Sequence, residues 1–325
     1  MSMNFHDPYQ QQWNAGVQVM PAKNLLLDAS YVGSRGVDLA RFHRINQPQP
    51  GQPVPYAQFQ PTLQTVDNSA ASKYSALQLK AEKRSSDLNL LSSYTWSKCT
   101  DNGSFFGSNV SGGTTAQNPN DLDAEWGRCQ YNTDHRFVTN VVYRLPFGPD
   151  RRRLTSGALS KVLGDWDLSG ILTVQSGHPL TVTRGVPQSG TVPTGGSDRP
   201  DMVGDPNVAG AVAANPSCVA PNEIRTVANW FNPCAFMAAP GRFGTAPRGN
   251  IIGPRFDNLD ISLIRDVPLS GERRRLRVEL QMFNVLNVAH YNLPVGNFDS
   301  KNFSRILQAN AGSPRQVQLG VKYVF

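Results

Sequence analysis

Four residues of one loop-like segment carry the side chains best suited to binding a ligand or a cation. Asp121, Asp123 and Glu125 alternate within the sequence NPNDLDAEW, and Trp126 follows them directly. Carboxylate oxygens suit calcium, but this spacing lacks the central glycine and the terminal bidentate glutamate of an EF-hand loop. A solvated acidic loop is therefore favoured over a metal site, and the four residues are candidates for contact with a ligand.

The histidines offer a second kind of chemistry, because a base beside a nucleophile is the mark of a hydrolase. His135 is the best placed of the five histidines, since it directly follows Asp134. The sequence contains no nucleophile elbow of the GxSxG type. We therefore expect no catalytic residues, no enzyme activity and no cofactor.

The four cysteines fall into two local pairs. Cys99 and Cys129 flank one loop-like stretch, and Cys218 and Cys234 lie within another. No CxxC spacing with matching histidines supports a zinc site. An even count placed in loops favours two disulfides, Cys99 with Cys129 and Cys218 with Cys234, in an oxidising compartment. The alternative is four free thiols.

The end of the chain is a strongly alternating segment, PRQVQLGVKYVF. Side chains in a strand alternate between two faces, so one face is apolar and the other polar. An apolar face that continues to the last residue must be covered either by a protein core, as in a soluble β-sandwich, or by lipid, as in an outer-membrane barrel. The apolar face consists of Val317, Leu319, Val321, Tyr323 and Phe325.

Composition favours the barrel. Hydrophobic residues make up 39% of the chain and charged residues 17%, and the mean hydropathy is −0.38. A barrel needs only one apolar face per strand, with polar residues filling its lumen and loops. The net charge of +7 is scattered along the chain. A nucleic-acid binder would gather its charge on one face, so no nucleic-acid partner is expected.

Alternating segments recur along the chain and predict about nine strands. Short turns alternate with long loops, which places all long loops at one edge of an antiparallel meander. That asymmetry is typical of outer-membrane barrels, whose short turns are periplasmic and long loops extracellular; only the connection 146–165 is long for a turn. The predicted loops, dense in Gly, Pro, Gln and Asn and without regular structure, are 33–72, 97–134, 177–257 and 284–313.

The predicted fold class is an all-β, antiparallel transmembrane barrel. Bacterial barrels have an even strand number with both termini in the periplasm, so a count of nine predicts the C-terminal part of a larger barrel. Aromatic residues near the strand ends are expected to form girdles at the membrane interfaces. These residues are Tyr31, Trp96, Phe137, Tyr143, Trp166 and Tyr323.

Several strings together resemble the C-terminal half of TonB-dependent, Oar-like outer-membrane receptors. The resemblance covers nearly the whole chain and is similar to the large acidobacterial type that carries an N-terminal carboxypeptidase-regulatory-like domain. The strings are ASYVGSRG, RINQP, YSALQLKAEKR, SYTWSK, AEWGRC, DHRFV, YRLPFG, SGILTVQSGHPLTV, FNVLNVAHYN and PRQVQLGVKYVF.

The resemblance implies energy-coupled import of a large or scarce ligand across the cell outer membrane. No signal peptide, TonB box or plug domain is recognisable, so contact with the TonB complex is expected only through N-terminal parts that precede this chain. The implied partners are outer-membrane lipid and, through the C-terminal strand, the barrel-assembly machinery. A binding or adhesive barrel without transport is the alternative, because long polar loops suit recognition equally well.

Overall fold

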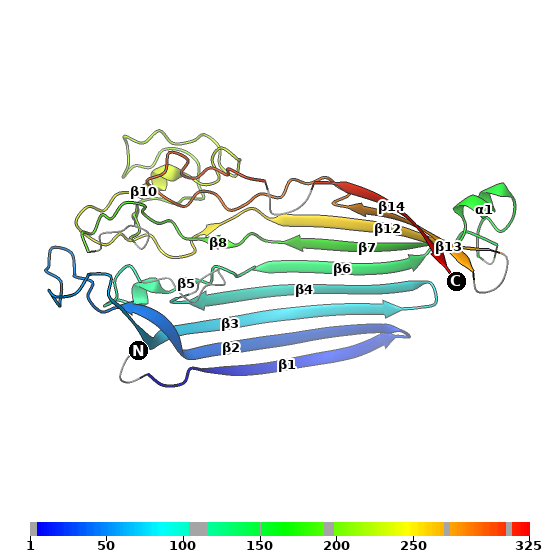
Figure 1. Ribbon diagram of the computed structural model, residues 1–325, viewed down its shortest axis with the longest axis horizontal. Helices are drawn as coiled ribbons and strands as arrows, with labels where there is room; N and C mark the ends of the chain where they lie inside the picture. Colours follow the sequence, from blue (N-terminus) through cyan, green and yellow to red (C-terminus); the bar gives the residue numbers. More distant parts are fainter. Residues whose placement is uncertain (1–4, 104–115, 150, 192–197, 270–273, 310–313) are drawn as a thin grey trace.

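The protein, described here by a computed structural model, is built almost entirely from β-strands. The structure describes residues 5–103, 116–149, 151–191, 198–269, 274–309 and 314–325. Nine strands lie side by side in sequence order in one antiparallel sheet (Figure 1). They are β1 (Tyr9–Ala22), β2 (Leu25–Arg44), β3 (Gln64–Arg84), β4 (Leu88–Asp101), β6 (His135–Arg144), β7 (Trp166–Gln175), β12 (Phe256–Pro268), β13 (Arg275–Phe283) and β14 (Gln316–Val324).

The remaining elements are short. β5 (Gly127–Arg128) pairs with the end of β4. Two small ribbons join β8 (Pro179–Leu180) to β11 (Ile251–Ile252) and β9 (Asp201–Met202) to β10 (Phe236–Met237). The helix α1 (Ala158–Leu163) and two single 3₁₀ turns, Asp123–Glu125 and Pro233–Ala235, complete the set.

No helix in the described part of the chain is both long enough and apolar enough to cross a membrane.

Short turns and long loops lie at opposite ends of the sheet (Figure 1). Asn24 closes the β1–β2 turn with a φ of 61°, a conformation that asparagine tolerates well. The longer connection between β6 and β7 contains α1 and is held against the sheet. The Trp166 indole donates to the Val162 carbonyl at 3.0 Å and Arg265 donates to the same oxygen at 2.9 Å. The short-turn end therefore stays compact.

The pairing register gives the sheet one apolar and one polar face, because directly opposed residues share a face. One row of direct partners crosses six strands and is apolar throughout. It consists of Leu88, Tyr143, Leu168, Leu263, Leu280 and Leu319. The alternation that each strand shows in sequence is thus brought together into one continuous apolar surface.

The polar face carries charges that neutralise one another across neighbouring strands. Arg144 pairs with Asp167 at 3.2 Å, Arg277 with Asp266 at 2.8 Å, and Lys322 with Glu279 at 2.9 Å. Each pair joins two adjacent strands.

No second layer covers the apolar face in the part of the chain that the structure describes. On β14, Val317 is 62% exposed, Leu319 71% and Val321 60%. Tyr323 and the terminal Phe325 are exposed as well. The β-sandwich interpretation of this strand is therefore wrong, since a sandwich would enclose these side chains.

The buried apolar core lies in the loops instead. Val182, Phe231, Ala235, Phe236, Ala246 and Ile251 form a buried cluster, which we call the loop core. Phe303 packs edge-to-face against Phe231 at 5.1 Å and against Phe236 at 5.8 Å. The disulfide between Cys218 and Cys234 closes a loop at its side. The long loops thus form a compact body at one end of the sheet.

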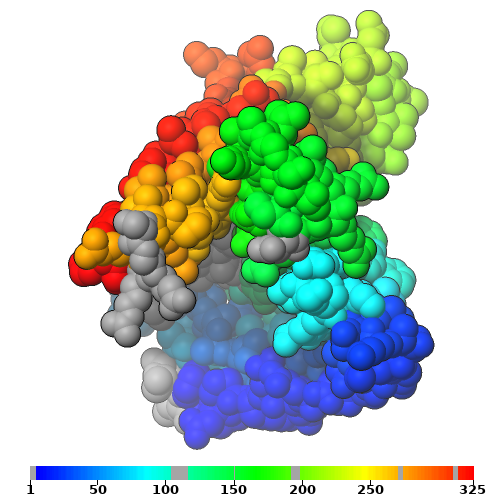
Figure 2. All heavy atoms as spheres, turned by 90° about the vertical axis from the view of Figure 1, so that its right-hand side faces the viewer, coloured from blue at the N-terminus to red at the C-terminus, as the bar shows by residue number. Residues whose placement is uncertain are grey.

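The sheet is curved and open. Seen from the short-turn end, the strands follow an arc from blue at the bottom, through cyan and green, to orange and red (Figure 2). β1 and β14 stand at the two ends of the strand order, and among the described residues they do not pair with each other. The prediction of an antiparallel, incomplete barrel wall agrees with this arrangement.

Several strands continue further than the sequence pattern predicted. The predicted loop 33–72 is wrong at both its ends, since β2 runs to Arg44 and β3 begins at Gln64. β4 likewise extends to Asp101, inside the predicted loop 97–134, and the predicted loop 177–257 holds four short strands and the first residues of β12. These extensions carry mostly polar residues and glycine, so the apolar alternation fades while the backbone pairing continues.

Leu263 offers a direct test of the face assignment. Its side chain lies on the apolar face between Leu168 and Leu280, whereas the next residue back, Ser262, lies on the polar face. If hydrocarbon covers the apolar face, Leu263→Arg should lower the free energy of unfolding by about 2–4 kcal/mol, and Ser262→Arg should have little effect. Equilibrium unfolding in guanidinium of the protein in lipid bilayers measures both. Equal losses would contradict the assignment.

Candidate ligand-binding site

The polar face is hollowed where β3, β4, β6 and β7 approach their loops. This space, which we call the loop-end hollow, has a volume of about 470 Å³. Its lining combines phenol rings, amides, hydroxyls and one guanidinium. The lining residues are Tyr74, Gln78, Thr95, Ser97, Cys99, Tyr131, Asn132, Thr133, Arg136, Gln175 and His178.

The sheet register builds one wall of this hollow. Gln78, Thr95, Arg136 and Gln175 are successive direct partners across four neighbouring strands. They share a face because opposed residues in antiparallel strands point the same way. A row of amide, hydroxyl and guanidinium groups thus faces the hollow from a rigid sheet.

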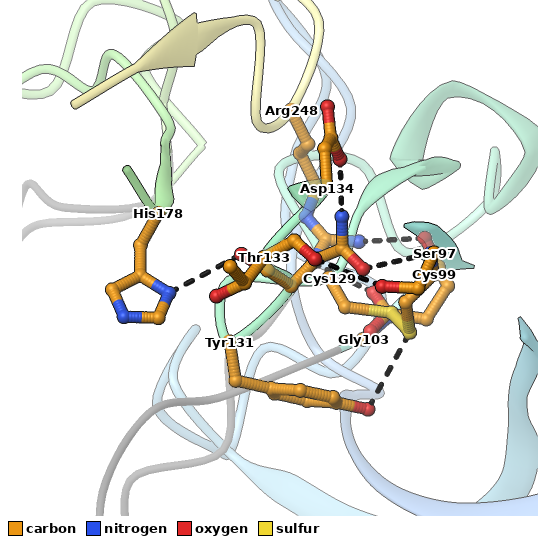
Figure 3. Close-up of a disulfide and its surroundings, with 11 residues drawn as sticks. Ser97, Cys99, Gly103, Cys129, Tyr131, Thr133, Asp134, His178 and Arg248 are labelled. Carbon is orange, nitrogen blue, oxygen red and sulfur yellow. Dashed lines mark hydrogen bonds and ion pairs between the residues drawn. A yellow bond between two sulfur atoms is a disulfide. The ribbon is translucent and has the colours of Figure 1, made fainter. Parts of the chain in front are cut away.

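The disulfide between Cys99 and Cys129 fixes the opposite wall (Figure 3). The Asn132 side chain accepts from the Cys99 backbone N–H at 3.0 Å, and the Ser97 hydroxyl donates to the Thr133 carbonyl at 2.8 Å. The segment 129–134 is therefore anchored to β4 by a covalent bond and by hydrogen bonds.

Tyr131 and His178 border the hollow from this segment and from the β7–β8 connection. The Tyr131 hydroxyl lies 3.8 Å from the Cys99 sulfur (Figure 3). Burial, reinforced by the negative charge of Asp101, raises the pKa of the Tyr131 phenol. The phenol therefore stays protonated and can donate a hydrogen bond. His178 Nδ1 lies 3.2 Å from the Asn132 carbonyl oxygen.

Arg136 sets the electrostatic character of the hollow. No carboxylate lines the hollow, and among the described residues no ion pair involves Arg136. The other polar-face arginines nearby behave differently, as Arg144 pairs with Asp167 on the same two strands. A guanidinium without a carboxylate partner leaves a local positive charge that suits an anionic group.

A second hollow of about 310 Å³ adjoins the first, because both are lined by Gln175 and His178. Phe256 and Tyr291 add aromatic surface to it, and Phe256 stacks on His290 at 4.2 Å. The two hollows together form a polar and aromatic groove under the loops.

The four acidic-loop candidates do not converge on one site. Asp121 and Asp123 are exposed, and Asp121 accepts from the Ala124 backbone N–H at 3.2 Å at the start of a 3₁₀ turn. Trp126 lies under the Lys73 ammonium, which is 5.5 Å from its ring centroid. None of the four lines either hollow described above.

Glu125 instead holds loops together. It forms a buried ion pair with Arg199 at 2.8 Å, and both side chains are 5% exposed. Its carboxylate also accepts from the Gln117 backbone N–H at 3.0 Å. A second buried pair, Arg248 with Asp101 at 2.9 Å, ties another loop to the end of β4. Both pairs cross between distant loops, which gives the loop end a fixed arrangement.

The described residues do not form a metal or hydrolase site from the groups considered above. Cys99, Asp101 and Cys129 are the only cluster of possible ligands in the described part of the chain, but both sulfurs are in the disulfide and Asp101 pairs with Arg248. His135 lies on the apolar face, where its ring contacts Tyr94 and Trp96. Its neighbour Asp134 turns the other way and pairs with Arg128.

Sequence reasoning missed the hollow itself. Arg136, Gln78 and Gln175 stand alone in their strands, with no spacing that marks a site. Only the cross-strand register brings them together. The one available signal was an arginine on the polar side of a strand at its loop end.

An open wall of long antiparallel strands, apolar on one face and polar on the other, with folded loops at one end, defines a segment of a membrane β-barrel. The sequence matches the outer membrane beta barrel domain family over residues 1–318. The chain therefore belongs to this family and is located in the outer membrane. The predicted fold class and location are confirmed.

Solved structures show the same fold at low sequence identity. The outer membrane transporter YddB from Escherichia coli is 13% identical, with a TM-score of 0.52 over 99% of this chain and 33% of that chain. The FrpB iron transporter from Neisseria meningitidis is 12% identical (TM-score 0.46, 100% and 32% covered). The ferric-catecholate import receptor Fiu from E. coli K12 is 11% identical (TM-score 0.47, 100% and 29% covered).

The chain spans about a third of the length of these structures. No curated protein matches the sequence.

The buried position of Glu125 leads to a prediction that separates a structural role from calcium binding. Glu125→Gln leaves the Arg199 charge buried without its partner and should destabilise the loop end locally by about 3–5 kcal/mol. Hydrogen exchange of segments 116–128 and 198–202 measures this loss. The exposed Asp123→Asn is the control and should change nothing. A calcium chelator that loosened the wild-type loops to the same extent would instead indicate a metal site.

Proposed function

We propose that the protein is the C-terminal barrel portion of a TonB-dependent, Oar-like receptor that imports a ligand through the outer membrane. The sequence strings given above support the Oar-like type with a carboxypeptidase-regulatory-like N-terminal domain. The fold shared with the transporter YddB supports a transporter barrel. The loops 33–72, 97–134, 177–257 and 284–313 then contribute the extracellular side, with strand extensions at their ends.

The observation that carries the proposal is the loop-end hollow with Arg136. A ligand that enters from the loop side meets amides, phenols and one guanidinium without a carboxylate partner. Sites of this kind fix orientation with a few placed polar groups and gain affinity from aromatic surface. The ligand is therefore one that carries a negative charge, bound by Arg136 with Gln78 and Gln175 beside it.

The partners follow from the same assignment. Lipid covers the apolar face, where Tyr31, Trp96 and Phe137 lie toward the loop end and Tyr143, Trp166 and Tyr323 toward the short-turn end, as interfacial girdles require. β14 is the strand offered to the barrel-assembly machinery. The TonB complex acts through N-terminal parts of the whole receptor. The acidic residues Asp121 and Asp123 remain exposed for contact with an arriving ligand.

Adhesion without transport is the second candidate, favoured by the exposed surface of the folded loops. It needs the loops but neither the hollow nor an energy supply. Uptake and surface attachment therefore respond differently to a change at Arg136.

The test compares cells carrying the complete wild-type receptor, a gene deletion and Arg136→Gln. Untargeted mass spectrometry of spent medium identifies anionic compounds that wild-type cells deplete. We expect the deletion to abolish this depletion, Arg136→Gln to slow it about tenfold or more through loss of a charge-assisted contact, and a protonophore to abolish it. Lys98→Gln, at the loop end of the apolar face, is the matched control. Normal depletion in the deletion strain with lost surface attachment would support adhesion instead.

A further inference from the structure

The apolar face bears a groove that the transport proposal does not use. It lies across β1 to β4 and reaches β6, and its volume is about 460 Å³. The groove is the one large hollow on this face among those the described residues form. It is on the opposite side of the sheet from the loop-end hollow.

Small side chains create the groove. Ala29, Ala81 and Ser92 lie close together in two adjacent rows of the sheet, where other positions of the face carry leucine, valine or aromatic residues. Leu79 and Tyr94 are direct partners in the row above, and Phe137 continues that row on β6. A strip of short side chains beside bulky ones leaves a channel along the wall.

The groove is chemically suited to hydrocarbon. Asp28 and Lys80 lie next to it along the chain, but their charged groups are on the polar face. The Asp28 carboxylate accepts from Ser30 at 2.7 Å, and the Lys80 ammonium pairs with Glu82 at 3.2 Å. The carboxylate and the ammonium are thus both engaged away from the groove.

The polar atom in the groove also has a partner. The Ser92 hydroxyl lies 3.0 Å from the Thr139 hydroxyl, its direct partner on β6. A hydroxyl that faces lipid needs such a bond, because hydrocarbon offers none. The groove therefore presents little unmet polarity to an acyl chain.

A cation stands at one end of the groove. Lys83 follows Ala81 by two residues on β3 and so lies on the same face, about 7 Å nearer the short turns. Its ammonium donates to the Lys23 carbonyl at 3.1 Å in the β1–β2 turn. Among the described residues no carboxylate pairs with Lys83, whereas Lys80 and Arg84 on the polar face both pair with Glu82.

We propose that this groove and Lys83 form a binding site for one anionic phospholipid of the periplasmic leaflet. The acyl chain occupies the strip along Ala29, Ala81 and Ser92, and the phosphate group pairs with the Lys83 ammonium. Short turns of outer-membrane barrels face the periplasm, which puts Lys83 at the headgroup level of that leaflet. Basic residues beside apolar grooves bind anionic headgroups in this way.

Charge and position select this occupant. A zwitterionic phosphatidylethanolamine fills the groove equally well but offers no net charge to Lys83. Lipopolysaccharide occupies the opposite leaflet, at the loop end, where Lys98 and not Lys83 lies on this face. The site therefore distinguishes lipids by headgroup charge and by leaflet.

Native mass spectrometry of the detergent-solubilised full protein tests the proposal. The probes are dioleoyl phosphatidylglycerol, dioleoyl phosphatidylethanolamine and purified lipopolysaccharide. We expect one phosphatidylglycerol to be retained in preference to phosphatidylethanolamine. Lys83→Gln should lower that retention about fivefold, the effect of one lysine at a charged lipid surface.

Ala81→Phe tests the groove separately from the charge. It fills the strip and should lower retention of both phospholipids. Leu263→Phe, on the same face of β12, and Lys98→Gln are the controls and should retain phosphatidylglycerol as the wild type does. Equal retention by wild type and Lys83→Gln, or a preference for lipopolysaccharide that Lys98→Gln removes, would overturn the proposal. If Ala81→Phe does not fold, Lys83→Gln still decides it.

Discussion

The backbone hydrogen-bond ladder is the constraint on which the rest of the structure depends. In hydrocarbon no water is available to pair with a free N–H or C=O, so a strand must find both partners in neighbouring strands. Continuous pairing from β1 to β14 meets this requirement along the wall. Because the ladder fixes the register, it also fixes which side chains share a face. The apolar row at Leu263, the ion pairs of the polar face and the row at Arg136 are all consequences of that one register.

A second kind of order appears at the loop end, where the chain leaves the apolar environment. There the structure resembles a small soluble domain, with a buried aromatic cluster around Phe231, two disulfides and two buried ion pairs. The sheet itself holds few fully buried apolar side chains, because its apolar face is meant for lipid and not for protein. The protein thus divides its stabilisation between two solvents, and the Cys99–Cys129 disulfide joins the two regions at the end of β4.

The sequence predicted the parts governed by short-range periodicity. The apolar alternation of segments such as 316–325 located the nine strands and their faces, and the even cysteine count with its spacing gave the pairs that are bonded in the structure. The extension of β2 to Arg44 was missed because pairing there rests on backbone bonds between polar residues. Glu125 was misread as a ligand candidate, since its partner Arg199 is far away in sequence. Arg136 was missed for the same reason, because its neighbours belong to three other strands.

The fixed arrangement of the loops affects what an incoming molecule encounters. Loops that fold only on contact lose conformational entropy at that moment, which weakens affinity. Here the ion pair of Glu125 with Arg199, the disulfides and the aromatic cluster have ordered the loop end beforehand. An arriving molecule meets a preformed mouth, so association costs mainly its own freedom of motion and the rate of capture is set by diffusion and by charge.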